Sequence, residues 1–132
     1  MQNLDQIRAA KALEAINRNG SRITKQTVSK LPAMIISNGL LAAAAFADEP
    51  KKESEAKRPE MQDAMDQVAQ HLKNPVHGIG ILTECDSAKK LIEKLTTGNA
   101  TSNDLQRATA EALAFISYLK RFAVKESNED NA

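Results

Sequence analysis

The sequence is poor in the residues that build disulfide-rich, aromatic-rich or loop-rich folds. Its 132 residues include one cysteine, no tryptophan, one tyrosine, three phenylalanines, five glycines and four prolines. A single cysteine cannot form an internal disulfide bond, which fits a reducing compartment. Alanine, leucine, lysine, glutamate and glutamine are abundant instead, and these residues favour helix by intrinsic propensity. We therefore expect a helical protein whose core is aliphatic and rich in alanine.

Long apolar runs are also missing. The longest uncharged stretch, residues 31–47, is shorter than the roughly 20 residues that a helix needs to span a bilayer. The opening residues, MQNLDQIRAAKAL, have charges among their apolar positions and lack the apolar run of a secretory signal. These absences predict a cytoplasmic protein without a membrane partner. The length suits one domain, residues 1–132, which can bury roughly two-thirds of the surface that the unfolded chain exposes.

Neither sign of charge dominates, but the net charge of +1 conceals an uneven distribution. Residues 1–47 hold six cations and two acids, residues 48–66 hold seven acids and four bases, and residues 126–132 add three acids. A basic first third and a basic final helix, separated by acidic segments, favour a local contact with a polyanion. Solvated helix faces that happen to be basic would produce the same pattern, and charge alone does not separate the two interpretations.

The most apolar stretch, residues 31–46 (LPAMIISNGLLAAAAF), is predicted to be the centre of the core. Leu31 and Ile35 fall within one arc at the helical advance of about 100° per residue. An Asn-Gly pair divides the stretch, and the alanine-rich second piece would let neighbouring backbones approach closely. Pro32 lacks an amide hydrogen, so it either kinks the first piece or begins a new helix.

Helical periodicity continues on both sides of this stretch. The charged segment at residues 48–60 is predicted to be a loop, and residues 126–132 a disordered acidic tail. Residues 74–85 have the character of a strand or loop, and the sequence assigns them no role. The expected fold class is all-α, a small single-domain bundle of five to six helices. The predicted helices are residues 3–19, a second helix capped by Ser21, residues 40–47, 61–73 and 86–97, and a last helix from Thr101 or Ser102 to about Lys125.

The first and last helices are predicted to be amphipathic. In the last helix Ile116 lies at the centre of the apolar arc, so it joins Ile35 as a predicted core residue. In the first helix the predicted inward face comprises Ile7, Ala9, Ala10, Ala12, Leu13 and Ile16. The polar stripes opposite comprise Arg8, Lys11, Glu14 and Arg18 in the first helix, and Arg107, Glu111, Ala114, Tyr118, Arg121 and Lys125 in the last.

Residues suited to catalysis or metal binding are scarce. His71, His77 and Cys85 are the candidate soft metal ligands or nucleophile–base pairs, and their spacing matches no zinc pattern. Acidic residues flank Cys85 on both sides and disfavour its thiolate, which is the reactive form. A Gly-x-Gly pair at residues 78–80 lacks the remaining residues of a nucleotide-binding loop. We therefore expect no enzymatic activity, no metal and no cofactor.

Two stretches resemble a known family. Residues 31–46 are similar to the Leu-Pro…Asn-Gly-Leu…Ala-Phe block of the small all-helical subunit of the Cmr complex, the type III-B CRISPR RNA-guided effector. Residues 107–123 (RATAEALAFISYLKRFA) are similar to its second signature, Thr-x-Glu-Ala-Leu-x-Phe…Leu-Lys-Arg-Phe-Ala. Tyr118 stands where the family often has tryptophan, Leu105 stands where it often has tyrosine, and residues 48–98 match nothing specific.

The resemblance implies a structural role in antiviral defence. Family members stack in several copies as a minor filament beside the backbone subunits that hold the guide RNA, and the target strand runs between the two filaments. The resemblance assigns RNA cleavage to the backbone subunits, and DNA cleavage and cyclic oligoadenylate synthesis to the large subunit. The expected partners are those subunits, other copies of this chain, and the guide RNA–target RNA duplex, mainly through its target strand.

The candidate RNA-binding residues are five cations and one tyrosine. Arg18, Arg22 and Lys25 cluster at the junction of the first two helices, and Arg121 and Lys125 lie on the last helix. Tyr118 shares the face of Arg121 and Lys125, where it could stack on a base or pack against a neighbouring subunit. The alternative function is a stand-alone helical adaptor or nucleic-acid-binding regulator, which would need a recognition helix that the sequence does not display.

Overall fold

A computed structural model of the chain describes residues 3–48, 59–73, 86–96 and 100–123. These residues form six α-helices and no strand, so the predicted all-α fold of a small helical bundle is confirmed for them. The helices are α1 (Leu4–Asn17), α2 (Lys25–Asn38), α3 (Leu40–Asp48), α4 (Pro59–Lys73), α5 (Ala88–Thr96) and α6 (Ser102–Phe122).

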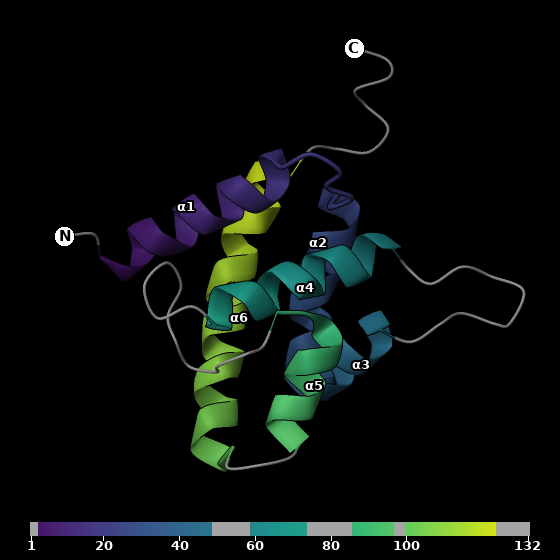
Figure 1. Cartoon of the computed structure of the whole chain (residues 1–132), viewed down its shortest axis with the longest axis vertical. Coiled ribbons are helices and arrows are strands. Elements are labelled where there is room, and N and C mark those ends of the chain that lie inside the picture. The colour runs from purple at the N-terminus through teal and green to yellow at the C-terminus, as the bar shows by residue number, and fades with distance from the viewer. Residues whose placement is uncertain (1–2, 49–58, 74–85, 97–99, 124–132) are drawn as a thin grey trace, which may run out of the picture.

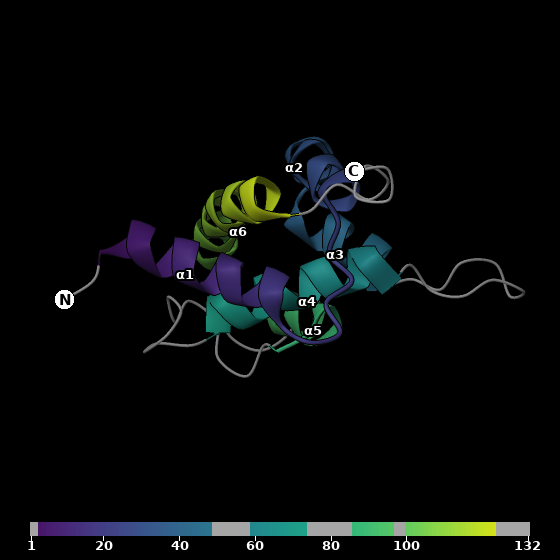
Figure 2. The same cartoon turned by 90° about the horizontal axis from the view of Figure 1, so that it is seen from above.

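The helices pack in two crossing layers. α6, the longest helix, lies beside α2, and α1 and α4 cross this pair on one side (Figures 1 and 2). α3 packs mainly against α5, far from α1 (Figure 1). α1 packs chiefly against α6 and touches α4 only lightly. The first helix therefore lies at an edge of the bundle and depends on α6 for its place.

The core is aliphatic and rich in alanine, as the composition predicts. The predicted core residues Leu31, Ile35 and Ile116 are at most 1% exposed, and Phe115 is the largest fully buried side chain. Small side chains let the helix axes approach closely, and the interior fills without bulky aromatics. Buried alanines come from α1, α3, α4, α5 and α6: Ala12, Ala15, Ala43, Ala44, Ala47, Ala64, Ala69, Ala88, Ala108 and Ala112.

The predicted break within residues 31–46 is confirmed. α2 ends at Asn38, and Gly39 follows with a φ of 92°, a conformation that residues with a Cβ rarely adopt. The Gly39 N–H donates to the carbonyl oxygen of Ile35 at 2.7 Å and so completes the end of α2. Pro32 lies inside α2, so the alternative that it begins a new helix is wrong.

Threonine side chains define two helix starts. Thr24 caps α2 by accepting a hydrogen bond from the N–H of Thr27 at 3.3 Å, so the prediction that Ser21 caps this helix is wrong. The chain stays non-helical from Ser21 to Thr24, which moves the cap three residues along. Thr101 caps α6, one of the two predicted positions, and Asp104 completes a capping box with bonds of 3.0 and 3.1 Å.

α1 is less embedded than its pattern predicts. Ala12 is buried, but Ala10 is exposed and Leu13 is 46% exposed, so the predicted inward face is too wide. α1 crosses α6 instead of lying along it, and a crossing helix buries only a narrow strip. Ala15, which the pattern did not select, lies on that strip and is buried.

Several predicted loops lie outside the described residues. Residues 49–58, 74–85 and 124–132 contain most of the predicted charged loop, the strand-like segment and the predicted acidic tail. Pro59 begins α4, where its missing amide hydrogen costs no helical bond.

Candidate nucleic-acid interface

A groove of about 520 Å³ lies between α2 and α6. Its cations are Lys25 from α2 and Lys120 and Arg121 from α6. The lining residues that the structure describes include no carboxylate, so the groove carries a local positive charge. The other lining residues are Pro32, Ile36, Leu113 and Ser117.

Helical spacing accounts for this composition. In α6, Leu113, Ser117 and Lys120 recur every three or four residues, so they share one face. In α2, Pro32 and Ile36 are one turn apart and likewise share a face. Each helix thus turns one face to the core and an adjacent face to the groove.

The groove unites two of the predicted RNA-binding residues from distant parts of the sequence. The sequence puts Lys25 and Arg121 in separate basic groups, and the structure places both on the groove lining. Lys120 was not predicted, although its three-residue spacing from Ser117 places it on the same face. Among the described residues, Lys25, Lys120 and Arg121 form no ion pair, so their charges are available to a ligand.

The other two cations of the predicted first group behave differently. Arg18 forms an ion pair with Asp63 of α4, and the backbone N–H of Arg22 donates to the second oxygen of Asp63 at 2.8 Å. Asp63 therefore fixes the connection between α1 and α2. The side chain of Arg18 is occupied within the protein, whereas the side chain of Arg22 is exposed.

Tyr118 is turned toward α1. Its interaction with the Asp5 carboxylate raises the pKa of the phenol, and its ring lies 6.1 Å from that of Phe122. Tyr118 does not line the groove with Arg121, its predicted neighbour. Lys125 lies outside the described residues.

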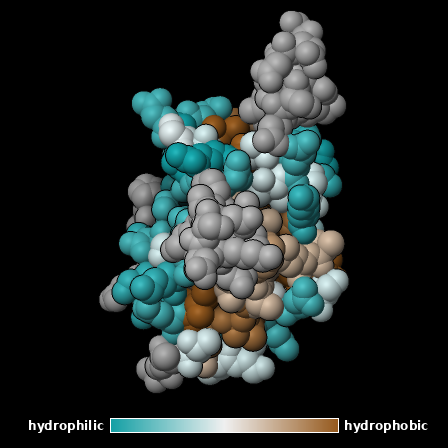
Figure 3. Space-filling model, turned by 90° about the vertical axis from the view of Figure 1, so that its right-hand side faces the viewer, coloured by the Kyte–Doolittle hydropathy of each residue, from teal (hydrophilic) through white to brown (hydrophobic). Residues whose placement is uncertain are grey.

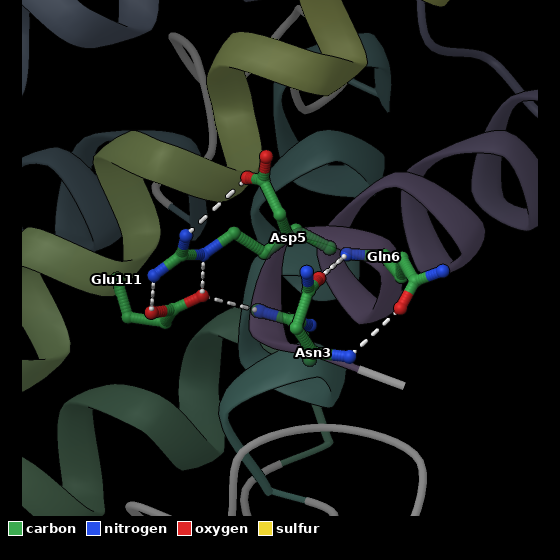
Figure 4. Close-up of polar contacts among 6 residues, drawn as sticks. Asn3, Asp5, Gln6 and Glu111 are labelled. Carbon is green, nitrogen blue, oxygen red and sulfur yellow. Dashed lines mark hydrogen bonds and ion pairs between the residues drawn. The ribbon is translucent and has the colours of Figure 1, made fainter. Parts of the chain in front are cut away.

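A buried polar network, which sequence reasoning missed, joins α1, α4 and α6. The Arg8 guanidinium donates to both carboxylate oxygens of Glu111, at 2.6 and 2.7 Å, and His71 Nε2 lies 2.9 Å from Glu111 Oε2. His71 also stacks on Phe115, with 4.4 Å between ring centroids. Figure 4 shows Glu111 facing the start of α1, where Asp5 adds a weaker ion pair to Arg8 at 3.6 Å. The assignment of Glu111 to the solvated stripe is therefore wrong.

The electrostatics of this network fix the charge of Glu111. Burial raises the pKa of the carboxyl group, but hydrogen bonds from Arg8 and His71 outweigh burial and lower the pKa to about 2. Glu111 is therefore a carboxylate at neutral pH and accepts from both partners. Because the pair is bidentate and mostly buried, it orients α1 on α6.

The described residues contain no group of three or more acidic, histidine or cysteine side chains that could hold a metal ion. His77 and Cys85, two of the three candidate ligands, lie outside the described residues. No helix within the described ranges is long and apolar enough to cross a membrane.

Comparison with known proteins gives the family. A sequence model of the CRISPR-associated protein family Cas_Cmr5 matches residues 4–126. The fold is similar to the crystal structure of a CRISPR-associated Cmr5 family protein from Thermus thermophilus, with a TM-score of 0.66 and 25% sequence identity over 95% of this chain and 100% of that one. No curated protein matches the sequence. The resemblance of residues 31–46 and 107–123 is thereby confirmed, and the chain belongs to the CRISPR-associated Cmr5 family.

Proposed function

We propose that the chain is a non-catalytic structural subunit of the type III-B CRISPR (Cmr) effector complex. In this proposal it stacks in several copies as the minor filament and helps to hold the target strand of the guide RNA–target RNA duplex. Its partners are the backbone and large subunits and other copies of itself. The proposal depends mainly on the groove lined by Lys25, Lys120 and Arg121. Family membership points to a CRISPR effector complex, and the three cations of the groove can bind the phosphates of an RNA strand.

The composition of the groove favours contact with the phosphate backbone. Phosphate oxygens accept hydrogen bonds from lysine and arginine, and such contacts carry no base information. The described lining contains no aromatic ring on which a base could stack. We therefore expect binding that is independent of sequence. That property suits a complex in which the guide RNA selects the target.

The expected affinity of one copy is low. Each phosphate neutralised on a single strand contributes about 0.7 to the slope of log affinity against log salt, so three cations give a slope of about 2. Useful affinity then requires several copies acting along one strand. A stacked filament would meet this requirement.

An exposed apolar surface supports the stacking part of the proposal. Ala42 and Ala45 of α3 are exposed, and the one charged residue of this helix is Asp48 at its end. Apolar residues gather at the level of α3 on the face that Figure 3 shows. A helix that is apolar all round normally has partners on every side. We assign this surface to a neighbouring copy or subunit.

The test is charge reversal within the assembled complex. Lys25→Glu, Lys120→Glu and Arg121→Glu together should weaken target binding and reduce the salt slope by about 2 per subunit. The matched control reverses three exposed cations outside the groove, Lys30, Lys89 and Arg107, and should retain the slope. Unchanged affinity and slope in the groove variant would refute RNA binding there. Loss of assembly in the groove variant alone would assign the groove to a protein contact instead.

A further inference from the structure

A second hollow, distinct from the groove, lies where α1, α4 and α6 meet. It has a volume of about 130 Å³. Its lining is largely polar. Of the described residues that line it, Phe115 alone has an apolar side chain. This volume exceeds the roughly 10–15 Å³ that one water molecule needs, so the hollow has room for a small polar ligand. The polar lining residues are Lys11, Glu14, Gln67, Gln70, His71 and Lys73.

His71 lines this hollow and has an unsatisfied polar atom. The side chain is 1% exposed, and its Nδ1 has no hydrogen-bond partner among the described residues. Nε2 carries a hydrogen in either charge state of the ring, because the Glu111 carboxylate accepts from it. Nδ1 is therefore left to accept a hydrogen bond when the ring is neutral, or to donate one when the ring is charged. A buried nitrogen of this kind normally has a hydrogen-bond partner.

The charges around the hollow favour an anionic partner. The Lys11 ammonium lies 3.1 Å from Glu14, so these two charges balance. Lys73 is half-buried and has no carboxylate partner among the described residues. Arg8 adds no free charge because its guanidinium hydrogen bonds go to Glu111. One cation in the lining is thus uncompensated.

We propose that the hollow binds a phosphate group between Lys11 and Lys73, with His71 Nδ1 as a hydrogen-bond partner. The carboxamides of Gln67 and Gln70 can donate to the remaining phosphate oxygens. A hydrogen phosphate can donate its O–H to a neutral Nδ1, or a phosphate oxygen can accept from a charged ring, so neither charge state is required. The phosphate is a free ion or the terminal phosphate of an RNA strand. This site is separate from the groove and does not rest on the proposed function.

The test uses the full chain labelled with ¹⁵N at histidine. The sequence has two histidines, so His77→Gln leaves His71 as the only imidazole signal. Titration with inorganic phosphate should shift the Nδ1 resonance saturably, and chloride at matched ionic strength should not. Lys73→Gln should weaken the apparent phosphate affinity roughly tenfold, while Lys89→Gln, at an exposed position on α5, should leave it unchanged.

Two oligonucleotides distinguish the sources of the phosphate. A short RNA with a 5′-phosphate that displaces the ion, while the same RNA without it does not, would identify a strand end as the ligand. Displacement by neither RNA would identify the free ion. No saturable shift with phosphate, an equal shift with chloride, or no loss of affinity in Lys73→Gln would overturn the proposal.

Discussion

Glu111 determines how the first helix is held. α1 contributes little apolar burial, and the Arg8–Glu111 pair anchors the first half of the helix to α6. His71 adds a third contact to the same carboxylate. Removing one partner from a buried pair leaves an uncompensated charge, which costs more than the pair itself contributes.

Glu111→Gln is therefore expected to lower the free energy of unfolding by about 3 kcal/mol, since the carboxamide cannot satisfy Arg8 as a bidentate acceptor. Urea unfolding followed by circular dichroism measures the loss. The control is Glu14→Gln, which alters an exposed ion pair with Lys11 and should cost less than about 1 kcal/mol. Equal losses in the two variants would show that the buried pair has no special role.

The same carboxylate predicts a dependence of stability on pH. Folding lowers the pKa of Glu111 from 4.5 to about 2, so its contribution is complete above pH 4.5 and is lost as the pH falls toward 2. The shift corresponds to about 3 kcal/mol. Urea midpoints measured between pH 6 and pH 2 should fall more steeply in the unaltered protein than in Glu111→Gln. Parallel pH curves would contradict the assignment.

The sequence was most informative about where individual helices begin and end. Gly39 caps the end of α2 and Thr101 caps the start of α6, and both follow from the local chemistry of caps and positive φ. Local chemistry could not choose between Ser21 and Thr24 as the cap of α2, because the choice depends on Asp63 holding the preceding segment from a distant helix. The width of the buried strip of α1 likewise depends on the angle at which it crosses α6.

The capping box of α6 yields a prediction at this scale. Thr101→Ala removes the side chain that accepts from the Asp104 N–H and should destabilise the protein by about 1 kcal/mol. Ser102→Ala, one residue further and exposed, is the matched control and should change stability by less than about 0.5 kcal/mol. Thermal and urea unfolding of both variants compare them. A larger loss in Ser102→Ala would move the cap by one residue.

The core of the whole domain is tested by two neighbouring residues in the last turn of α2. Ile35 is 1% exposed and Ile36 is 73% exposed. Ile35→Asp places an unpaired charge in the core, which should cost several kcal/mol and unfold a marginally stable domain. Ile36→Asp should retain a wild-type circular dichroism spectrum and melting temperature within a few degrees. Folded Ile35→Asp protein would show that the core lies elsewhere.

The sequence predicts the candidate sites only in part, because the residues of each site come from helices that are far apart in the chain. Lys25 and Arg121 were found as cations on polar faces, but their shared groove depends on how α2 lies beside α6. Glu111 was misassigned because its partners, Arg8 and His71, belong to other helices. The sequence does contain one indication that Glu111 is buried. In the signature Thr-x-Glu-Ala-Leu-x-Phe, Glu111 is followed by apolar residues, which end at the Phe115 on which His71 stacks.

The claim that the target strand lies in the groove between α2 and α6 is tested most directly by crosslinking in the assembled complex. Ser117→Cys places a thiol in the groove, Ser102→Cys places one at the exposed start of the same helix, and Cys85→Ser removes the native thiol from both. The target RNA carries a thiol-reactive group on a backbone phosphate. We expect the RNA to crosslink to position 117 and not to position 102. A complex that binds its target normally but crosslinks equally at both positions, or only at 102, would contradict that claim.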